Sequence, residues 1–313
     1  MKKILGLGNC LVDILVQLTE NEALQPLGLP AGSMQLIDLS EKEKIDGFLA
    51  EAEIRKVPGG SAANTIKALA NGGVTCGFVG KIAHDDNGEF FLKTLQGVGV
   101  ETFLTYGEGA ATGVANTFIT PDGQRTFATY LGISGSLSAS DVKPEMLQGY
   151  DCLYVEGYMV QNYELMDHVM GLAKQMGMKV CLDLASYNVV EANLDFFHHL
   201  LRDYVDIVFA NEEESHAVIG CDPAEALLKL GELCEVAIVK LGAKGASAIM
   251  DGKVAKVPAI DVPAVVDTTG AGDYFAAGFL KAFVEGKDLE TCLNEGSELS
   301  AKVIQVIGCP ILS

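Results

Sequence analysis

The sequence predicts an α/β fold in which a mostly parallel, Rossmann-like sheet is covered by helices on both faces. Short strand-like runs at 152–155, 180–184, 207–210 and 236–239 are separated by segments with helical spacing of apolar residues. Strands that alternate with helices in this way form doubly wound sheets. With 313 residues, 49% of them hydrophobic, the chain is long enough for a sizeable core.

The first strand is expected at residues 3–8, and a carboxylate follows it at Asp13. Open α/β sheets bind ligands beyond the carboxyl ends of their strands, so Asp13 is placed for a ligand contact. The alternative is an aspartate that caps a turn, and the residues alone favour that alternative.

Two early segments look extended but contain no helices between their strands. The first comprises residues 14–17 and 33–38, and the second comprises residues 101–132 with a turn at 121–123. Because such strands do not fit a strand–helix–strand pattern, we expect a small antiparallel sheet inserted into the larger fold. This sheet either covers a site or forms a peripheral extension.

A helix is expected to begin after Gly59 and Gly60 and to stop at Gly72. Paired glycines leave room for a ligand to approach the first turn of the helix closely. Asn64 lies one turn into the helix, where its amide can both donate and accept hydrogen bonds. Many helices begin in this way, so the pattern alone is not specific.

Two polar segments follow later strands. Residues 211–214 (Asn-Glu-Glu-Glu) come after strand 207–210, on the ligand side of the predicted sheet. Their alternative role is a helix-capping asparagine with acidic residues in the first turn. Residues 239–246 form a strand and a Gly-rich turn, which alone indicates only a turn between elements. No G-x-x-x-x-G-K-[ST] sequence occurs, so the chain is not a P-loop protein.

The most informative stretch is residues 267–273, Asp-Thr-Thr-Gly-Ala-Gly-Asp. Val265 and Val266 are expected to end a strand, and helical spacing starts at Phe275. A Gly-rich turn at the start of a helix presents backbone N–H groups and partial positive charge to an anion. A carboxylate in that turn, Asp273, suits a phosphotransferase that must deprotonate a hydroxyl. Tight packing with an ordinary helix-start aspartate is the alternative.

Composition excludes several classes of partner. The chain has 42 acidic and 22 basic residues and a net charge of −20, which argues against binding to nucleic acid or anionic membranes. No apolar run approaches the roughly 20 residues of a membrane span. The eight cysteines are scattered, without a C-x-x-C pair. We therefore expect buried reduced thiols and a cytoplasmic protein.

The string at residues 267–273 resembles the signature of the PfkB/ribokinase family of sugar and nucleoside kinases. Three other segments resemble family motifs, in the family's order: Gly-Asn-x-x-x-Asp ending at Asp13, Gly-Gly-x-x-x-Asn ending at Asn64, and Asn-x-x-Glu beginning at Asn211. The resemblance runs nearly end to end, and agreement at four ordered sites is not expected by chance.

The resemblance implies a ribokinase-like three-layer α/β/α sandwich, with residues 1–313 as a single kinase domain. A small β-sheet lid is implied from roughly residues 11–38 and 101–133. The implied cofactors are ATP and Mg²⁺, and a need for a monovalent cation such as K⁺ stays open. The implied partner is a small sugar or nucleoside, bound by a monomer or by a homodimer formed through the lid.

The resemblance also implies roles for individual residues. Asp273 is the catalytic base, and the anion hole comprises Gly270, Ala271 and Gly272. Substrate-binding residues are Asp13, Gly59, Gly60 and Asn64, with Asn9 as a weaker candidate. ATP-binding residues are Lys240, Gly242, Gly245, Thr268 and Ser297. Mg²⁺ is organised, through water, by Asn211 and Glu214. Many relatives carry Thr at the position of Lys240 and Asn or His at that of Ser297, so this chain departs from the pattern there.

The expected reaction is transfer of the ATP γ-phosphate to a primary hydroxyl. Residues 125–132 and the Gly308-Cys309 ending look most like the adenosine-kinase-like branch. A fructokinase, ribokinase or ketodeoxygluconate kinase is the alternative, and a catalytically silent ligand-binding protein is a further one. A nucleotide-binding oxidoreductase is disfavoured, because Leu11 interrupts the G-x-G-x-x-G pattern that Gly6 and Gly8 begin.

Overall fold

A nine-stranded sheet forms the body of the protein in the computed structural model, which describes residues 2–30, 34–50, 52–121 and 125–312. Seven strands run parallel, and the last two extend the sheet as an antiparallel hairpin. In spatial order the strands are β14 (Lys253–Val257), β13 (Ala246–Met250), β12 (Val236–Lys240), β11 (Ile207–Asn211), β10 (Lys179–Asp183), β9 (Cys152–Glu156), β1 (Ile4–Leu7), β5 (Cys76–Ala83) and β6 (Glu101–Gly107).

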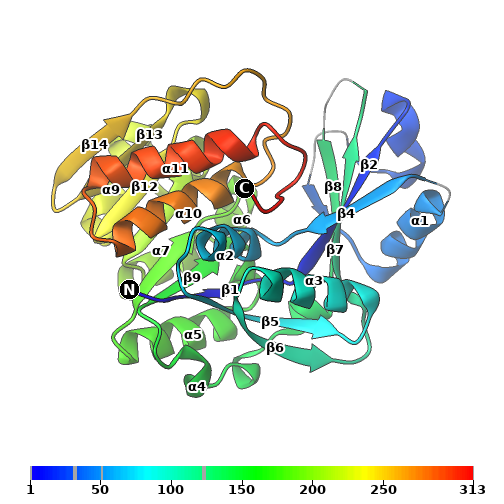
Figure 1. Cartoon of the computed structure of the whole chain (residues 1–313), viewed down its shortest axis with the longest axis horizontal. Coiled ribbons are helices and arrows are strands. Elements are labelled where there is room, and N and C mark those ends of the chain that lie inside the picture. The colour runs from blue at the N-terminus through cyan, green and yellow to red at the C-terminus, as the bar shows by residue number, and fades with distance from the viewer. Residues whose placement is uncertain (1, 31–33, 51, 122–124, 313) are drawn as a thin grey trace.

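Helices cover both faces of this sheet (Figure 1). Because side chains alternate along a strand, Ile4 and Leu5 enter separate cores on opposite faces. One face carries α2 (Ser61–Asn71), α3 (Asp86–Gly97), α10 (Ala271–Val284) and α11 (Leu289–Val303). The other carries α4 (Pro144–Leu147), α5 (Tyr163–Gln175), α6 (Tyr187–Ala192), α7 (Leu194–Asp203), α8 (Glu212–Ile219) and α9 (Pro223–Leu233). The layers are those of the predicted three-layer sandwich.

A second, five-stranded sheet stands beside the body, on the right in Figure 1. Its strands, in spatial order, are β3 (Met34–Leu36), β8 (Arg125–Gly132), β7 (Thr112–Ile119), β2 (Leu11–Gln17) and β4 (Ile54–Pro58). Helix α1 (Leu39–Leu49) packs near its β8 strand. The chain passes from β1 into β2 almost directly, so Asp13 lies within a strand of the small sheet.

The small sheet differs from the expected one in three respects. It is mixed, since β2 pairs parallel with β7 and β3 pairs parallel with β8. Residues 101–107 belong to the large sheet, where β6 extends the parallel order beyond β5. Residues 54–58 supply the edge strand β4 instead. The tip of the expected turn, Asp122 and Gly123, lies outside the described residues.

The expected strand before residues 267–273 does not form. Residues 258–268 have no regular secondary structure, and Val265 and Val266 are 59% and 50% exposed. Their β-branched side chains favour extended backbone, but no neighbouring strand pairs with them among the described residues. The turn is held instead through backbone N–H groups of Val266 and Asp267, which donate to the carbonyl of Ile304.

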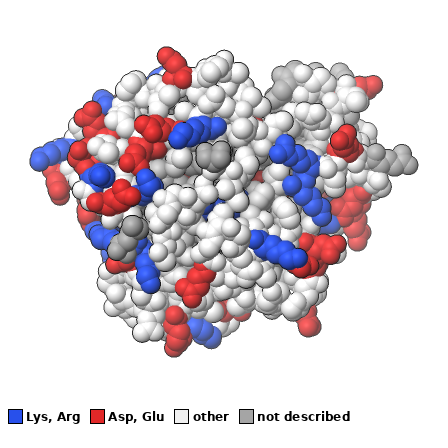
Figure 2. Space-filling model, in the orientation of Figure 1, with Lys and Arg blue, Asp and Glu red and all other residues white. Residues whose placement is uncertain are grey.

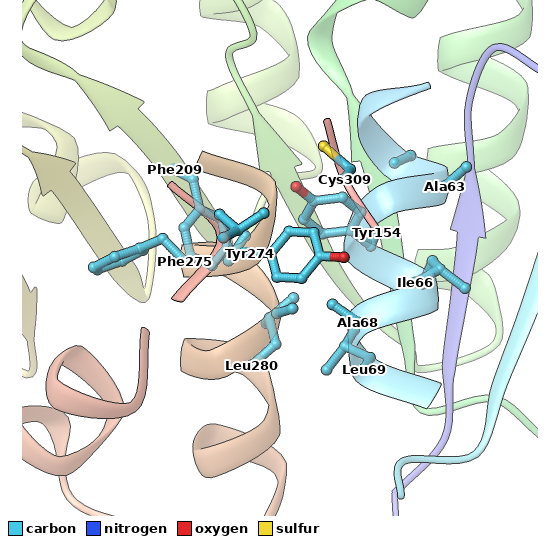
Figure 3. Close-up of a cluster of buried hydrophobic side chains, with 14 of the residues drawn as sticks. Ala63, Ile66, Ala68, Leu69, Tyr154, Phe209, Tyr274, Phe275, Leu280 and Cys309 are labelled. Carbon is cyan, nitrogen blue, oxygen red and sulfur yellow. The ribbon is translucent and has the colours of Figure 1, made fainter. Parts of the chain in front are cut away.

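Helices α2 and α10 pack against each other beneath this turn. Ala68 and Leu69 of α2 lie toward Leu280 of α10, and the ring of Tyr274 sits between the two helices (Figure 3). Small side chains on α2 permit this close approach. The contact fixes the starts of two helices relative to each other.

The surface matches the composition. On the face shown in Figure 2, acidic and basic side chains are interspersed rather than gathered into a basic stripe. Of the eight cysteines, all are free thiols and only Cys221 is not buried. Within the described ranges, no helix combines the length and apolar character that crossing a bilayer requires.

Candidate active site

A cavity of about 450 Å³ lies between the carboxyl edge of the large sheet and the small sheet. Successive parallel strands end at its floor, and they supply Glu156 from β9, Asp183 from β10, Asn211 from β11 and Lys240 from β12. Asn9 follows β1 at the same edge. Ligands of open α/β sheets bind at this edge, and a pocket with convergent polar groups is the default candidate for an active site.

The turn at 267–273 forms one wall of the cavity. Gly270 caps helix α10 with φ of 75°, and a side chain there would overlap the Cys309 sulfur. Asp267 braces the turn, since its carboxylate accepts from Thr269 N at 2.7 Å and from Gly308 N at 2.6 Å. The first N–H groups of a helix lack acceptors within it, so this end suits an anion.

Asp273 faces the cavity and is held by two side chains of α2. Ser61 Oγ donates to its Oδ1 at 2.7 Å, and Asn64 Nδ2 donates to its Oδ2 at 3.0 Å. Burial raises the pKa of Asp273 to about 6, against the lowering effect of these two hydrogen bonds. A carboxylate with a pKa near neutrality is suited to accept a proton as a general base.

Asp13 and Asn64 approach the same part of the cavity from different elements. The Asp13 carboxylate accepts no hydrogen bond within the described part of the chain, and burial raises its pKa to about 7. The Oδ1 atom of Asn64 is buried and has no hydrogen-bond partner within the described part of the chain. Both acceptors are therefore available to substrate hydroxyl groups.

Gly59 and Gly60 allow the chain to pass close to these acceptors. A side chain at Gly59 would overlap Asp13 Oδ1. Gly60 has φ of 81°, and a side chain there would lie 2.5 Å from the carbonyl oxygen of Asn9. Gly60 lines the cavity, whereas Gly59 lies behind Asp13. The two glycines thus contribute to the site because they have no side chains that would overlap Asp13 or the Asn9 carbonyl.

Two buried charged residues at this side escaped the sequence analysis. Glu156 is 1% exposed and accepts hydrogen bonds from Asn9 and Ala62. Lys67 is 2% exposed, and its Nζ has no hydrogen-bond partner among the described residues. Burial lowers the pKa of Lys67 to about 8, while Cys309, Asp13 and Asp273 act to raise it. Neither residue belongs to a recognisable motif, so only the fold marks them.

Lys240 and Asp183 form an ion pair of 2.9 Å at the other end of the cavity. Burial opposes the charge on Lys240, but Asp183 and Glu214 outweigh it and raise the Lys240 pKa. Gly242 and Thr268 also line the cavity. A side chain at Gly272 would come within 3.1 Å of Lys240 Nζ, so the cation lies next to the helix start.

Two predicted ATP-binding residues lie away from this lining. Gly245 has φ of 96°, and its missing side chain leaves room for the Val257 carbonyl, so its role is in the turn. Ser297 is buried within α11. Neither is among the described residues around the cavity, and their proposed contacts therefore need a ligand that extends beyond it.

Asn211 and Glu214 line the cavity and form hydrogen bonds with each other. Glu214 accepts from Asn211 N at 2.8 Å and from Asn211 Nδ2 at 2.7 Å, and Asn211 Oδ1 accepts from Glu214 N at 2.8 Å. The pair is thus a capping box at the start of α8. Burial raises the pKa of Glu214 to about 7, with Lys240 opposing and Asp183 reinforcing the shift.

The donor set is compatible with Mg²⁺ held mainly by water and phosphate oxygens. Nowhere in the described ranges do three or more His, Cys, Asp or Glu side chains cluster as metal ligands. Glu214 and Asn211 offer oxygen atoms, which Mg²⁺ prefers, and Mg²⁺ commonly keeps several waters. These residues fit an outer, water-mediated contact.

The small sheet supplies a wall of different character. Facing the polar floor, it places in the cavity the side chains of Leu11, Met34, Leu36, Phe127, Thr129 and Leu131. They come from β2, β3 and β8, three strands that are distant in sequence. Apart from Asp13 and Thr129, the small sheet therefore presents an apolar wall that faces the polar floor of the body.

Comparison with known proteins identifies the family. The family description "pfkB family carbohydrate kinase" matches residues 31–312, which is most of the chain. The chain belongs to the PfkB family. The predictions of the family, of the ribokinase-like fold and of a phosphotransferase acting on a sugar or nucleoside hydroxyl are therefore confirmed. Kinases of the PfkB family use ATP and usually Mg²⁺.

Relatives of this PfkB kinase include both adenosine and sugar kinases. It is similar to an adenosine kinase from Sinorhizobium meliloti, with 31% identity, a TM-score of 0.92, and coverage of 100% of this chain and 97% of that one. A probable sugar kinase from Rhizobium etli CFN 42 is also 31% identical, with a TM-score of 0.91 and coverage of 100% and 96%. Adenosine kinase 2 of Arabidopsis thaliana is 27% identical over 98% of this chain and 94% of its own length.

Proposed function

We propose that this PfkB kinase transfers the γ-phosphate of ATP to the primary hydroxyl of a ribonucleoside. The observation that carries the proposal is the mixed lining of the cavity, in which the polar groups of Asp13 and Asn64 are combined with an apolar wall around Phe127. A ribose fits the polar side through its hydroxyls, and a planar base fits the apolar side. A free sugar would leave most of the apolar wall in water.

The proposed chemistry uses the residues around the turn. The substrate hydroxyl lies near Asp273, which takes the proton as the hydroxyl oxygen forms a bond to the γ-phosphorus. The bond between that phosphorus and the bridging oxygen breaks, and ADP leaves. The start of α10, at Gly270, Ala271 and Gly272, stabilises negative charge on the transferred group. Asp13, Asn64 and Asn9 hold the acceptor.

The nucleotide is assigned to the other end of the cavity. Lys240, Gly242 and Thr268 lie there beside the helix start, with Gly245 shaping the adjoining turn. Asn211 and Glu214 are proposed to orient Mg²⁺ through water, and Mg²⁺ supplies charge neutralisation during phosphoryl transfer. Ser297 is proposed to lie near the adenine. Rates measured with and without K⁺ test whether a monovalent cation is required.

The small sheet is proposed to act as a lid. It contributes one wall of the cavity, so its displacement would open the site and its closure would exclude water. The expected lid segments, 11–38 and 101–133, are revised to strands β2, β3, β4, β7 and β8. A monomer and a lid-to-lid homodimer are both compatible with this role. Eight free cysteines favour a reducing compartment, and we place the reaction in the cytoplasm.

A substrate screen tests this function. ADP release with Mg²⁺ and ATP is measured over adenosine, other ribonucleosides, ribose, fructose and ketodeoxy sugar acids, and the product is identified by mass spectrometry. We expect kcat/KM for one ribonucleoside to exceed that for ribose by about 100-fold, because an aromatic contact and its burial are worth about 2–3 kcal/mol. Preference for a free sugar overturns the nucleoside assignment, and binding without turnover indicates a silent ligand-binding protein.

A further inference from the structure

Glu156 occupies a central place at the edge of the sheet. It ends β9, which lies between β1 and β10, and it is in register with Asp183 of β10. Its side chain is almost fully buried, yet it lines the cavity. A buried carboxylate is costly unless hydrogen bonds compensate for the lost hydration. The hydrogen bonds to Glu156 therefore decide whether its carboxylate is stable in this position.

Three N–H groups converge on this carboxylate. Oε1 accepts from Asn9 N at 2.9 Å and from Asn9 Nδ2 at 2.8 Å, and Oε2 accepts from Ala62 N at 2.7 Å. The Ala62 N–H belongs to the first turn of α2, where a helix lacks internal acceptors and attracts negative charge. A side chain at Gly8 would lie 2.6 Å from Oε2, so the backbone is shaped around the carboxylate.

The two segments that donate hydrogen bonds to Glu156 both border the acceptor side of the cavity. Asn9 lines the cavity, and its Oδ1 accepts from Ser134 Oγ at 3.4 Å. The first turn of α2 carries Ser61 and Asn64, whose side chains donate to Asp273. Glu156 thus joins two segments that are far apart in the chain but line the same cavity.

We propose that Glu156 is a positioning residue of the acceptor site, and that its ionised carboxylate sets the side-chain amide of Asn9 and the first turn of α2 for acceptor binding. The inference rests on the proposed placement of the acceptor at Asn9, Asp13 and Asn64. Glu156 acts through these neighbours and takes no part in proton transfer.

The three converging N–H donors favour the ionised form of Glu156. A carboxylate has only acceptors, whereas a protonated acid or a glutamine amide also carries a donor that would face an N–H group. Burial raises the pKa of Glu156 to about 7, while the hydrogen bonds from Ala62 and Asn9 oppose the shift. The titratable groups near it are Asp273, Asp183, Cys10, Tyr154 and Tyr158. Acceptor binding should accordingly weaken as the pH falls through about 7, and protonation of Asp13, whose pKa burial also raises to about 7, adds to this loss.

The test compares Glu156→Gln with a matched control, Asp206→Asn. Asp206 also accepts a backbone N–H from a neighbouring strand, that of Val180 at 2.7 Å, but at the opposite edge of the sheet. Calorimetry gives the Kd of the best acceptor from the screen, without ATP, from pH 6 to pH 8.5, and the Kd of ATP. We expect Glu156→Gln to weaken acceptor binding about 10-fold at pH 8 and to reduce its pH dependence to the part that Asp13 contributes.

ATP affinity should change less than about 2-fold in Glu156→Gln, since the nucleotide end is not held by this residue. Asp206→Asn should lower the melting temperature without altering acceptor Kd. If Glu156→Gln lowers only the melting temperature, or retains the wild-type pH dependence, the positioning role is wrong. A wild-type protein that binds none of the acceptors instead contradicts the proposed function, and this is seen before any variant is made.

Asn9→Ala provides a second variant for the case in which Glu156→Gln does not fold. It removes one of the groups that Glu156 holds, so acceptor binding should weaken and its dependence on pH near 7 should shrink. Where both variants fold, their double mutant should lose less than the sum of the two single losses. Full additivity, or an unchanged pH dependence in Asn9→Ala, overturns the proposal.

Discussion

The two sides of the cavity are built on different principles. On the body side, polar residues stand at the ends of parallel strands and helix starts, and each is held by another element, as Asp273 is by Ser61 and Asn64. On the small-sheet side, apolar residues such as Phe127 and Leu131 provide surface without hydrogen bonds to a ligand. We infer that the body carries the chemistry and that the small sheet, through Asp13 and its apolar wall, selects the acceptor. Variants on each side should therefore have separable effects.

The largest effect is expected at Asp273. Asp273→Asn keeps the size of the side chain but removes the base, so kcat should fall by about 10²- to 10⁴-fold with little change in ATP binding. Steady-state kinetics and ATP calorimetry measure the two quantities. Near-normal turnover would show that the body side does not supply the base at this residue.

Asp13→Ala should weaken acceptor binding by about 2–4 kcal/mol, and Asn64→Ala by somewhat less, because hydrogen bonds to a charged acceptor are the stronger ones. ATP affinity should hold in both. An acceptor analogue that lacks the hydroxyls bound by Asp13 should be poor for the wild type, and the difference between the two acceptors should shrink in Asp13→Ala. If the loss caused by Asp13→Ala and the loss caused by removing the hydroxyls simply add, Asp13 does not bind those hydroxyls and has a structural role only.

Phe127→Ala tests the other side of the cavity. Loss of the ring should raise KM for a nucleoside by about 10-fold and leave KM for ribose nearly unchanged, because only the base contacts this wall. Ile54→Ala is the control, since Ile54 is an exposed apolar residue of the same sheet outside the cavity. Equal losses for nucleoside and ribose would contradict the division of roles.

Lys67→Met should shift the pH dependence of the reaction. The Lys67 cation lowers the pKa of Asp13, which burial has raised to about 7. Without this cation the Asp13 pKa rises further, so the carboxylate is ionised only at higher pH. The acid limb of kcat/KM against pH should then move upward, with a loss of several-fold at pH 7.

Thermal melts of Lys67→Met separate this electrostatic effect from a structural one. Burial lowers the Lys67 pKa to about 8, so the folded state holds its proton less tightly than the unfolded chain does. Replacing this unpaired buried charge by an apolar side chain should maintain or raise the melting temperature. Lys67→Arg should retain the wild-type pH profile. If the pH profile of kcat/KM is not shifted in Lys67→Met, the charge of Lys67 has no influence on the site.

The smallest effect is expected at Glu214. If Glu214 orients Mg²⁺ through water, Glu214→Gln should raise the Mg²⁺ concentration for half-maximal rate by about 3- to 10-fold and leave acceptor affinity unchanged. Glu213→Gln, at an exposed neighbour in the same helix turn, is the control. An unaltered Mg²⁺ dependence would leave Asn211 and Glu214 as a helix cap only.

The placement of much of the candidate site was predictable because its motifs are local. A glycine turn at a helix start can be recognised from a few consecutive residues. Gly270, Gly60 and Asn64 occupy the expected elements. Glu156 and Lys67 could not be found in this way. The contacts of Glu156 depend on residues 147 and 94 positions away, and Lys67 is buried near Cys309, Asp13 and Asp273, which lie in other parts of the chain.

The errors in the predicted fold have the same origin. Strand character at residues 101–107 does not say which sheet will accept the strand, and pairing with β5 places it in the large one. Val265 and Val266 have the composition of a strand but no partner strand in the described structure. Pairing and register are long-range properties, whereas β-propensity is local and depends on context.

The brace on the turn at residues 267–273 has a consequence for synthesis of the protein. Asp267 is held by Gly308, 41 residues further along the chain, and Cys309 packs beneath Gly270. On the ribosome, Asn9 emerges first, Asp273 emerges much later, and this brace emerges last. A nascent chain that stops short of Gly308 would carry the proposed base, Asp273, but the turn before it would lack this support. We therefore expect catalytic competence to begin only when these late residues have left the ribosome.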